Sequence, residues 1–419
     1  MENSVKRVKY ACYATNVTMA IVCNLSPLLF IIFRTAYGIS YSLLGLLVLI
    51  GFCTQLTIDL IFSFFSHKFN LNKTVKITPL LATFGLVIYA VLPIFLRANA
   101  YIGLVIGTII FSASSGFAEV LISPVIAQIP AKDPDREMSK LHSIYAWGVV
   151  GIVGFSTLFL FIFGSESWSV LTLILTIVPV LATILFAGAK IPDLPKPEKI
   201  SGTISFIKNK AVWLCVFAIF LGGASELVMG QWSSSYLETA LGLPKIYGDI
   251  FGVMLFALTQ GIGRTLYAKI GKNIYRVLIL GAIGAFICYL TAAVTPLPII
   301  GLIACALTGF CIAMMWPGSL IVSSEKFPNG GVLMFALMAA GGDLGASVGP
   351  QLVGVITDVT IASSFASGLA SNLGITVEQL GMKAGMLIGS IFPLLAILVF
   401  TLLFIKRNNK NTLSNEKDC

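Results

Sequence analysis

Charged side chains are scarce in this sequence. Asp, Glu, Lys and Arg together make up 11% of its 419 residues, against about 25% in ordinary soluble proteins. Apolar residues fill 57% of the chain, and the mean hydropathy is +0.95. This composition excludes an ordinary soluble protein, and the intervals between the apolar runs are too short to hold a separate soluble domain.

Residue types that bind metals or carry out catalysis are equally rare. His67 and His142 are the two histidines, and the eight cysteines form no Cys-x-x-Cys pair. Most of the cysteines lie within apolar runs, which is typical of small core residues. A Gly-x-x-x-x-Gly-Lys-Ser/Thr phosphate-binding loop is also missing. These absences argue against an enzyme, a nucleotide-driven pump, a metal centre and a resident cofactor.

Apolar runs of about twenty residues occur along the whole chain, and each can cross a hydrocarbon core of about 30 Å. They predict twelve membrane-spanning helices at 10–33, 41–66, 75–96, 100–129, 141–163, 168–189, 211–236, 247–270, 275–295, 298–323, 331–358 and 382–405. The segment Lys190–Lys210, with three prolines and five lysines, divides them six and six. We therefore predict an all-α membrane protein with two six-helix halves, 1–190 and 211–419, joined by a polar linker at 191–210.

The basic residues lie predominantly on one side of the predicted spans. With the N-terminus in the cytoplasm, 22 of the 27 Lys and Arg residues fall in inner segments. Arg34, Arg97, Lys245 and Lys383 fall in outer segments, and Arg264 lies within a span. This bias predicts a multi-pass protein of the cell membrane with both termini cytoplasmic. The same bias explains the net charge of +9, so no nucleic-acid partner is expected. The expected partner of the apolar spans is the lipid bilayer.

Four residues of the first half recur at a constant spacing of 193 positions in the second. Gly116, Phe117, Pro124 and Gly148 return as Gly309, Phe310, Pro317 and Gly341. Glu119, by contrast, is replaced by Ile312. Residues that shape the backbone are therefore repeated, whereas the chemically reactive one is not. Two such halves predict a substrate site where the halves meet. The alternative is a chance match in a glycine-rich apolar chain.

Five ionisable side chains lie inside predicted spans: Asp59, Glu119, Glu226, Arg264 and Asp343. Such groups usually face a partner or a water-filled cavity. Glu119 and Glu226 lie near the middle of their spans, where burial penalises the charged form and favours loading and release of a proton. The alternative is a neutral structural carboxyl group. Arg264 needs a counter-charge, and Asp59 and Asp343 are the candidates, unless its side chain reaches the inner interface. Asp249 lies near an outer end, where water can solvate it.

Aromatic and amide side chains indicate what the spans could bind. Trp316 precedes Pro317, and flat aromatic faces beside polar groups suit a sugar ring or another semi-polar molecule. Trp232 lies nearer an outer end, where packing or an interfacial belt explains it equally well. Asn24 and Gln231 can hydrogen-bond a hydroxylated ligand, or can hold helices together.

The arrangement of spans and loops resembles the major facilitator superfamily over essentially the whole chain. The shared features are two six-span halves, a basic loop between spans two and three with its partner between eight and nine, and a proline–lysine linker. The superfamily loop pattern is roughly Gly-x-x-x-Asp-Arg-x-Gly-Arg-Lys. Here 63–73 keeps the basic character but lacks the aspartate and the glycines, and 264–272 is closer but also lacks the acid. A gate based on that aspartate is therefore without support. The acid in span four and the polar residues in spans one and seven look most like the fucose-permease-like branch of sugar–proton symporters.

In that fold spans one, four, seven and ten line a central cavity, and spans two, five, eight and eleven flank it. The resemblance implies that Glu119, Glu226 and Trp316 lie in or near the cavity, joined as substrate candidates by Asn24 and Gln231. It places five gate candidates on the flanking helices: Asp59, His142, Tyr145, Arg264 and Asp343.

The resemblance implies a monomeric secondary transporter that moves a small organic solute by alternating access, coupled to protons. An efflux antiporter of the same fold is the alternative. Drug antiporters usually carry a Gly-Pro-rich fifth span, whereas here that span has Gly148, Gly151 and Gly154 but no proline. This difference favours import, and a receptor that does not transport its ligand also stays open.

Overall fold

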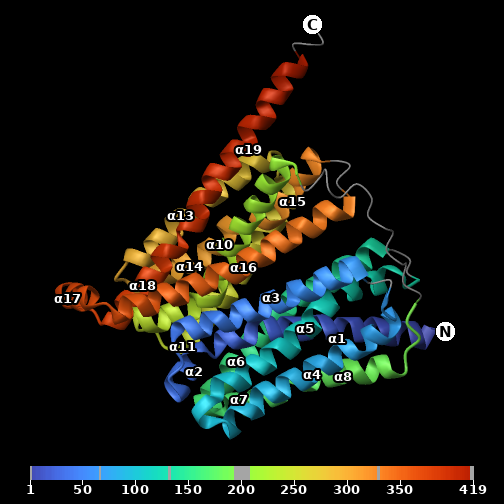
Figure 1. The fold of residues 1–419 in the computed structure, drawn as a ribbon, viewed down its shortest axis with the longest axis horizontal. Helices are drawn as coiled ribbons and strands as arrows, with labels where there is room; N and C mark the ends of the chain where they lie inside the picture. Colours follow the sequence, from blue (N-terminus) through green and yellow to red (C-terminus); the bar gives the residue numbers. More distant parts are fainter. Residues whose placement is uncertain (1, 66–67, 131–133, 193–207, 328–330, 416–419) are drawn as a thin grey trace. The chain divides into compact units, whose positions relative to one another are not determined.

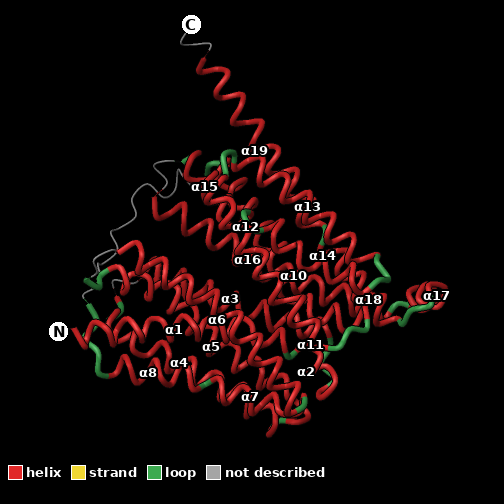
Figure 2. Tube along the Cα trace, turned by 180° about the vertical axis from the view of Figure 1, so that it is seen from behind, coloured by secondary structure: helices red, strands yellow, loops and turns green. Residues whose placement is uncertain are grey.

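The computed structural model describes residues 2–65, 68–130, 134–192, 208–327 and 331–415, and these residues form helices joined by short loops (Figures 1 and 2). The chain divides into two compact units, Met1–Lys199 and Ile200–Cys419. We describe each by itself as unit 1 and unit 2. The predicted domain limits stay predictions, since most of the expected linker lies outside the described residues.

The described residues of unit 1 form six helical segments in chain order. They are α1 (Glu2–Leu28) with α2 (Phe30–Tyr37), α3 (Tyr41–Phe65), α4 (Leu71–Phe95), α5 (Ala100–Ala127), α6 (Pro134–Phe163), and η3 (Ser165–Ser167) with α7 (Trp168–Leu175) and α8 (Ile177–Ala187). A short 3-10 turn, η2 (Arg97–Asn99), joins α4 to α5. The first segment bends by 48° between α1 and α2, directly after Pro27, because proline cannot supply the backbone N–H that would continue the helix.

Unit 2 also contains six helical segments. They are α10 (Lys210–Leu241), then α11 (Lys245–Tyr247), the π-helical η4 (Gly248–Met254) and α12 (Leu255–Ile270), then α13 (Ile274–Val294), α14 (Pro298–Ile312) with α15 (Met315–Lys326), α16 (Gly331–Ala362), and α18 (Val377–Gly389) with α19 (Ile391–Asn415). The additional helix α17 (Ser364–Leu373) lies between α16 and α18.

Each predicted span falls on one of these segments. Among the described residues, ten segments are long and apolar enough to cross a membrane, and the bent pair α1–α2 makes eleven. The remaining predicted span lies on α6, whose shorter apolar part is Trp147–Phe163. One difference concerns the predicted outer loop near 360–381, which contains α17 and the first turn of α18. Thr376 and Gln379 form a capping box that starts α18 earlier than predicted.

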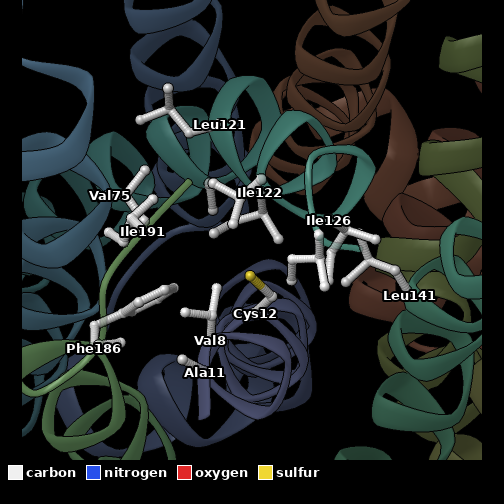
Figure 3. Close-up of a cluster of buried hydrophobic side chains, with 14 of the residues drawn as sticks. Val8, Ala11, Cys12, Val75, Leu121, Ile122, Ile126, Leu141, Phe186 and Ile191 are labelled. Atoms are coloured by element: carbon white, nitrogen blue, oxygen red, sulfur yellow. The ribbon is translucent and has the colours of Figure 1, made fainter. Parts of the chain in front are cut away.

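The core of unit 1 shows how its helices are held together. Figure 3 shows apolar side chains from α1, α4, α5, α6 and α8 converging on one cluster. Cys12 lies inside it between Val8 of α1 and Ile122 of α5, and all three side chains are at most 2% exposed. Cys12 therefore behaves as a small apolar core residue. The seven cysteines within the described residues are all free thiols.

The first pair of repeated glycines makes the same contact in each unit. A Cβ atom at Gly116 of α5 would lie 2.9 Å from the carbonyl oxygen of Gln55 in α3. A Cβ atom at Gly309 of α14 would overlap the carbonyl oxygen of Phe256 in α12. In each unit the fourth span thus touches the backbone of the second span of the same unit, and only glycine permits that approach.

The second pair of repeated glycines follows the same rule. A Cβ atom at Gly148 of α6 would lie 3.1 Å from Cβ of Ala20 in α1. A Cβ atom at Gly341 of α16 would lie 2.7 Å from a methyl group of Val216 in α10. In each half the repeated glycine of the fifth span therefore packs closely against the first span of the same half. This agreement supports a duplicated helix packing over a chance match.

Candidate functional site

Glu119 lies on α5, where it is paired with an amide rather than with a cation. Gln55 of α3 donates a hydrogen bond from Nε2 to Oε2 of Glu119 over 2.5 Å. Gln55 is buried, whereas Glu119 is exposed. The close approach at Gly116, one turn before Glu119, brings α3 near enough for this bond. Within the described residues of unit 1, no Lys or Arg lies within ion-pair distance of Glu119.

Glu226 of α10 and Arg264 of α12 form an ion pair within unit 2. Nη2 of Arg264 lies 3.6 Å from Oε2 of Glu226, and the two side chains are 45% and 20% exposed. The prediction that Asp343 neutralises Arg264 is therefore corrected, because the carboxylate within ion-pair distance of Arg264 in the described residues of unit 2 is Glu226. Asp59 belongs to unit 1, and its pairing with Arg264 stays a prediction. Periodicity along one helix identifies a polar face, but it does not identify the helix which that face meets.

The second partner of Arg264 explains its position. In an α-helix the N–H of Pro317 would bond the carbonyl of Ala313, but proline has no N–H. The helix breaks here, since α14 ends at Ile312 and α15 begins at Met315. Nε of Arg264 donates to the carbonyl oxygen of Ala313 over 3.1 Å. The arginine therefore supplies the hydrogen bond that Pro317 removes.

Trp316 packs on the backbone of two glycines. A Cβ atom at Gly342 of α16 would overlap its indole ring, and one at Gly223 of α10 would lie 3.2 Å from it. Trp316 is half-buried, so part of its ring stays accessible. Gly223 lies one turn before Glu226 on α10, which places an aromatic ring and an ion pair at neighbouring levels of unit 2.

The remaining substrate candidates are engaged within their own units. Asn24 is half-buried, and its Nδ2 donates to the carbonyl oxygen of Ala20 in the same helix over 2.9 Å. Gln231 is buried in α10. The neighbouring Trp232 is fully buried and donates from Nε1 to the carbonyl oxygen of Pro350 over 3.0 Å. Trp232 thus holds α10 against α16, in accordance with its interpretation as a packing residue.

The gate candidates are distributed over both units. Asp59 of α3 and Tyr145 of α6 are half-buried in unit 1, and Asp343 of α16 is buried in unit 2. His142 belongs to α6, but its side chain lies outside the described residues. Their assignment as gate residues stays a prediction.

Sequence reasoning missed a polar cluster at the start of η4. Asp249 is 1% exposed, and it accepts hydrogen bonds from Ser234 Oγ over 2.5 Å and from Lys245 Nζ over 3.0 Å. The expectation that water solvates Asp249 is therefore wrong. The signal was present in the sequence, because Lys245 and Asp249 are four residues apart and hence neighbours on one helical face.

A second missed cluster lies at the start of α6, outside its apolar stretch. The Glu137 carboxylate pairs with Lys9 of α1 and with Lys140, and it accepts a hydrogen bond from Tyr13 over 3.0 Å. The hydrogen bond from Lys9 is the main cause that lowers the pKa of Glu137 to about 2, and Lys140 and Tyr13 act in the same direction. Glu137 therefore stays ionised and ties α6 to α1.

Comparisons with known proteins decide the family. The model of the Major Facilitator Superfamily matches residues 10–350. The chain belongs to this superfamily. It is thus a multi-pass membrane transporter rather than an enzyme, and the predicted all-α fold with twelve helices is confirmed. No curated protein matches the sequence.

Solved superfamily structures share the fold at low sequence identity. A D-xylose–proton symporter is 16% identical with a TM-score of 0.71, covering 93% of this chain and 97% of its own. The nucleoside transporter NupG is 13% identical with a TM-score of 0.68, covering 96% and 99%. The fucose:proton symporter of E. coli is 14% identical with a TM-score of 0.59, covering 94% and 98%. At these identities the likeness shows a shared fold.

Proposed function

We propose that this superfamily member imports a small polar organic solute together with protons, and that Glu119 carries the proton. The observation behind this assignment is the contact between Glu119 and Gln55. A carboxylate in a span needs a neutralising partner, and Glu119 has an amide donor but no cation among the described residues of unit 1. Reversible protonation can then neutralise the Glu119 carboxylate, and release of the proton restores its charge.

Glu226 is less suited to this role. Its counter-charge is Arg264, so its ionised form is already compensated. Glu226 is therefore assigned to holding Arg264 in position, and Glu119 to proton transfer. The two carboxylates lie in different units, which allows them to have different tasks.

The solute class rests on the polar and aromatic groups of unit 2. The half-buried Trp316 ring offers an apolar face one turn from the Glu226–Arg264 pair, and such a combination suits a ring-bearing polar solute. Two of the proteins that share the fold are proton symporters of D-xylose and of fucose, which is in keeping with this class. The bias of basic residues supports a cell-membrane location with cytoplasmic termini, and we propose that the monomer works without a cofactor.

Uptake into proteoliposomes tests the proton assignment. A pH gradient, acidic outside, should accelerate uptake of a transported solute by wild-type protein at least tenfold. Glu119→Gln should lose this acceleration and keep solute exchange across membranes of equal pH, since the substitution removes the proton site but preserves the shape. Glu166→Gln, at an exposed position of η3, is the matched control. Unchanged gradient-driven uptake in Glu119→Gln would refute the assignment.

A further inference from the structure

The guanidinium group of Arg264 is anchored by one of its N–H groups. Nε bonds the carbonyl oxygen of Ala313, which fixes the plane of the group. Neither Nη atom makes a hydrogen bond to the described part of the chain, and Oε2 of Glu226 lies 3.6 Å from Nη2, beyond the usual hydrogen-bond length. The side chain is 45% exposed. A fixed guanidinium fork with accessible N–H groups matches the two oxygens of a carboxylate.

Gln260 adds a donor one turn before Arg264. It is 9% exposed, and within the described residues its buried Nε2 has no hydrogen-bond partner. The spacing of four residues puts Gln260 and Arg264 on one face of α12. Phe256, a further turn back, lies on the same face, and its ring is 3.5 Å from the Cβ position of Gly230 in α10. The Gln260 amide therefore lies on α12 between two points of contact with α10, where a buried N–H needs an acceptor.

The backbones of α10 and α12 are farther apart at this level than those of α10 and η4. α10 packs closely on η4, but the α12 that continues from η4 makes few close backbone contacts with α10. The Glu226–Arg264 ion pair joins the two helices at this level. Within the described residues, the Nη groups of Arg264 and the Nε2 group of Gln260 make no hydrogen bond, so a ligand with negative charge and oxygen acceptors complements them.

We infer that Arg264 and Gln260 form a binding site for the carboxylate group of the transported solute. The Glu226 carboxylate competes with the solute carboxylate for Arg264. The guanidinium fork takes the two carboxylate oxygens, and the Gln260 amide donates to one of them. The inference rests on the proposed transport function and narrows its solute to an organic acid, such as a sugar acid. A single guanidinium group beside one carboxylate suits a monoanion better than a phosphate dianion.

Matched probes test the site by direct binding to purified protein at neutral pH. D-glucuronate and D-glucose differ at one carbon by a carboxylate in place of a hydroxymethyl group, and lactate and propane-1,2-diol form a second such pair. The carboxylate member of at least one pair should raise the unfolding temperature and bind saturably in calorimetry, and its neutral partner should bind at least tenfold more weakly. Inorganic phosphate should also bind at least tenfold more weakly than that carboxylate.

Three variants separate this site from a structural role of Arg264. Arg264→Gln should abolish carboxylate binding, and Gln260→Leu should weaken it about tenfold. Glu226→Gln should tighten it several-fold, because the competing carboxylate is gone. If Arg264 only balances the charge of Glu226, Glu226→Gln leaves binding unchanged or weakens it. Arg276→Gln, which removes an exposed positive charge from the start of α13, is the control and should bind as wild type does.

The outcomes that overturn the inference are distinct from those that overturn the proposed function. Failure of every carboxylate probe to bind, equal binding of the neutral partners, preference for phosphate, or weaker binding by Glu226→Gln overturns the carboxylate site. Should Arg264→Gln fail to fold, Gln260→Leu decides, and wild-type affinity in that variant overturns the site. Glu119-dependent, gradient-driven uptake of a neutral sugar would refute the carboxylate site and leave proton-coupled transport standing. Saturable carboxylate binding without gradient-driven uptake would do the reverse.

Discussion

The two units share close helix contacts at the repeated glycines, but they differ in the helix that contains the repeated proline. In unit 1, α5 continues through Pro124 to Ala127, and Glu119 lies on this continuous helix. In unit 2 the corresponding helix breaks before Pro317, and Ile312 stands in place of Glu119. The comparison teaches that the two units share the helix packing at the repeated glycines, whereas each unit has polar residues at different positions.

The broken helices are also distributed unequally. Unit 1 has a break in its first span, between α1 and α2, where Ser26 and Tyr89 share a hydrogen bond of 2.8 Å. Unit 2 keeps its first span, α10, continuous and has a break between α14 and α15. The last span is interrupted in both units, between α7 and α8 and between α18 and α19. A break exposes backbone carbonyl groups that require donors, and in unit 2 that donor is Arg264. Polar side chains thus lie beside broken helices, and the positions of the breaks differ between the units.

The largest expected effect concerns the repeated glycines. Gly309→Ala should destabilise the protein by about 3 kcal/mol, because the added methyl group meets the fixed carbonyl of Phe256. Gly116→Ala should cost less, about 1–2 kcal/mol, since the approach there is less close. Gly154→Ala, with no atom near its Cβ position, is the control. The midpoint of thermal unfolding in detergent reports the order, and equal midpoints for Gly309→Ala and Gly154→Ala would contradict it.

A smaller effect tests the carbonyl at the break of unit 2. In a Pro317→Ala background the backbone can supply its own N–H to Ala313, so Arg264→Gln should cost about 1 kcal/mol less than in wild type. The Pro124→Ala background should leave the cost of Arg264→Gln unchanged, because Arg264 donates to the carbonyl of Ala313, whose helical N–H partner is lost at Pro317 and not at Pro124. The four unfolding midpoints of each double-mutant cycle give the coupling. Additive effects in the Pro317 cycle would show that the bond to Ala313 adds nothing to stability.

Most of the helix layout could be predicted from the sequence, because each span needs about twenty apolar residues and reports its own position. The partners of the polar residues could not. Glu119 meets Gln55 across 64 residues of sequence, and Arg264 meets Glu226 rather than Asp343. Such pairs depend on which helix faces meet, and that is decided by close approaches such as the one at Gly309. The start of α18 was missed for a different reason, since the Thr376–Gln379 capping box outweighs a segment rich in Ser, Gly and Ala.

The smallest expected effect concerns the pairing of the first and fifth spans. In unit 1, Glu137 joins α6 to Lys9 of α1 in addition to the contact at Gly148. The folded-state pKa of Glu137, about 2, lies below the unfolded value near 4.3. The stabilisation is therefore complete above the unfolded value and is lost as the pH falls through the folded one. Glu137→Gln should cost about 1 kcal/mol, equally at pH 8 and pH 5 and less at pH 3. Unfolding midpoints at these pH values, compared with those of Glu166→Gln, measure this dependence. A cost that grows on acidification would mean that the neutral form of Glu137 is the one that stabilises unit 1.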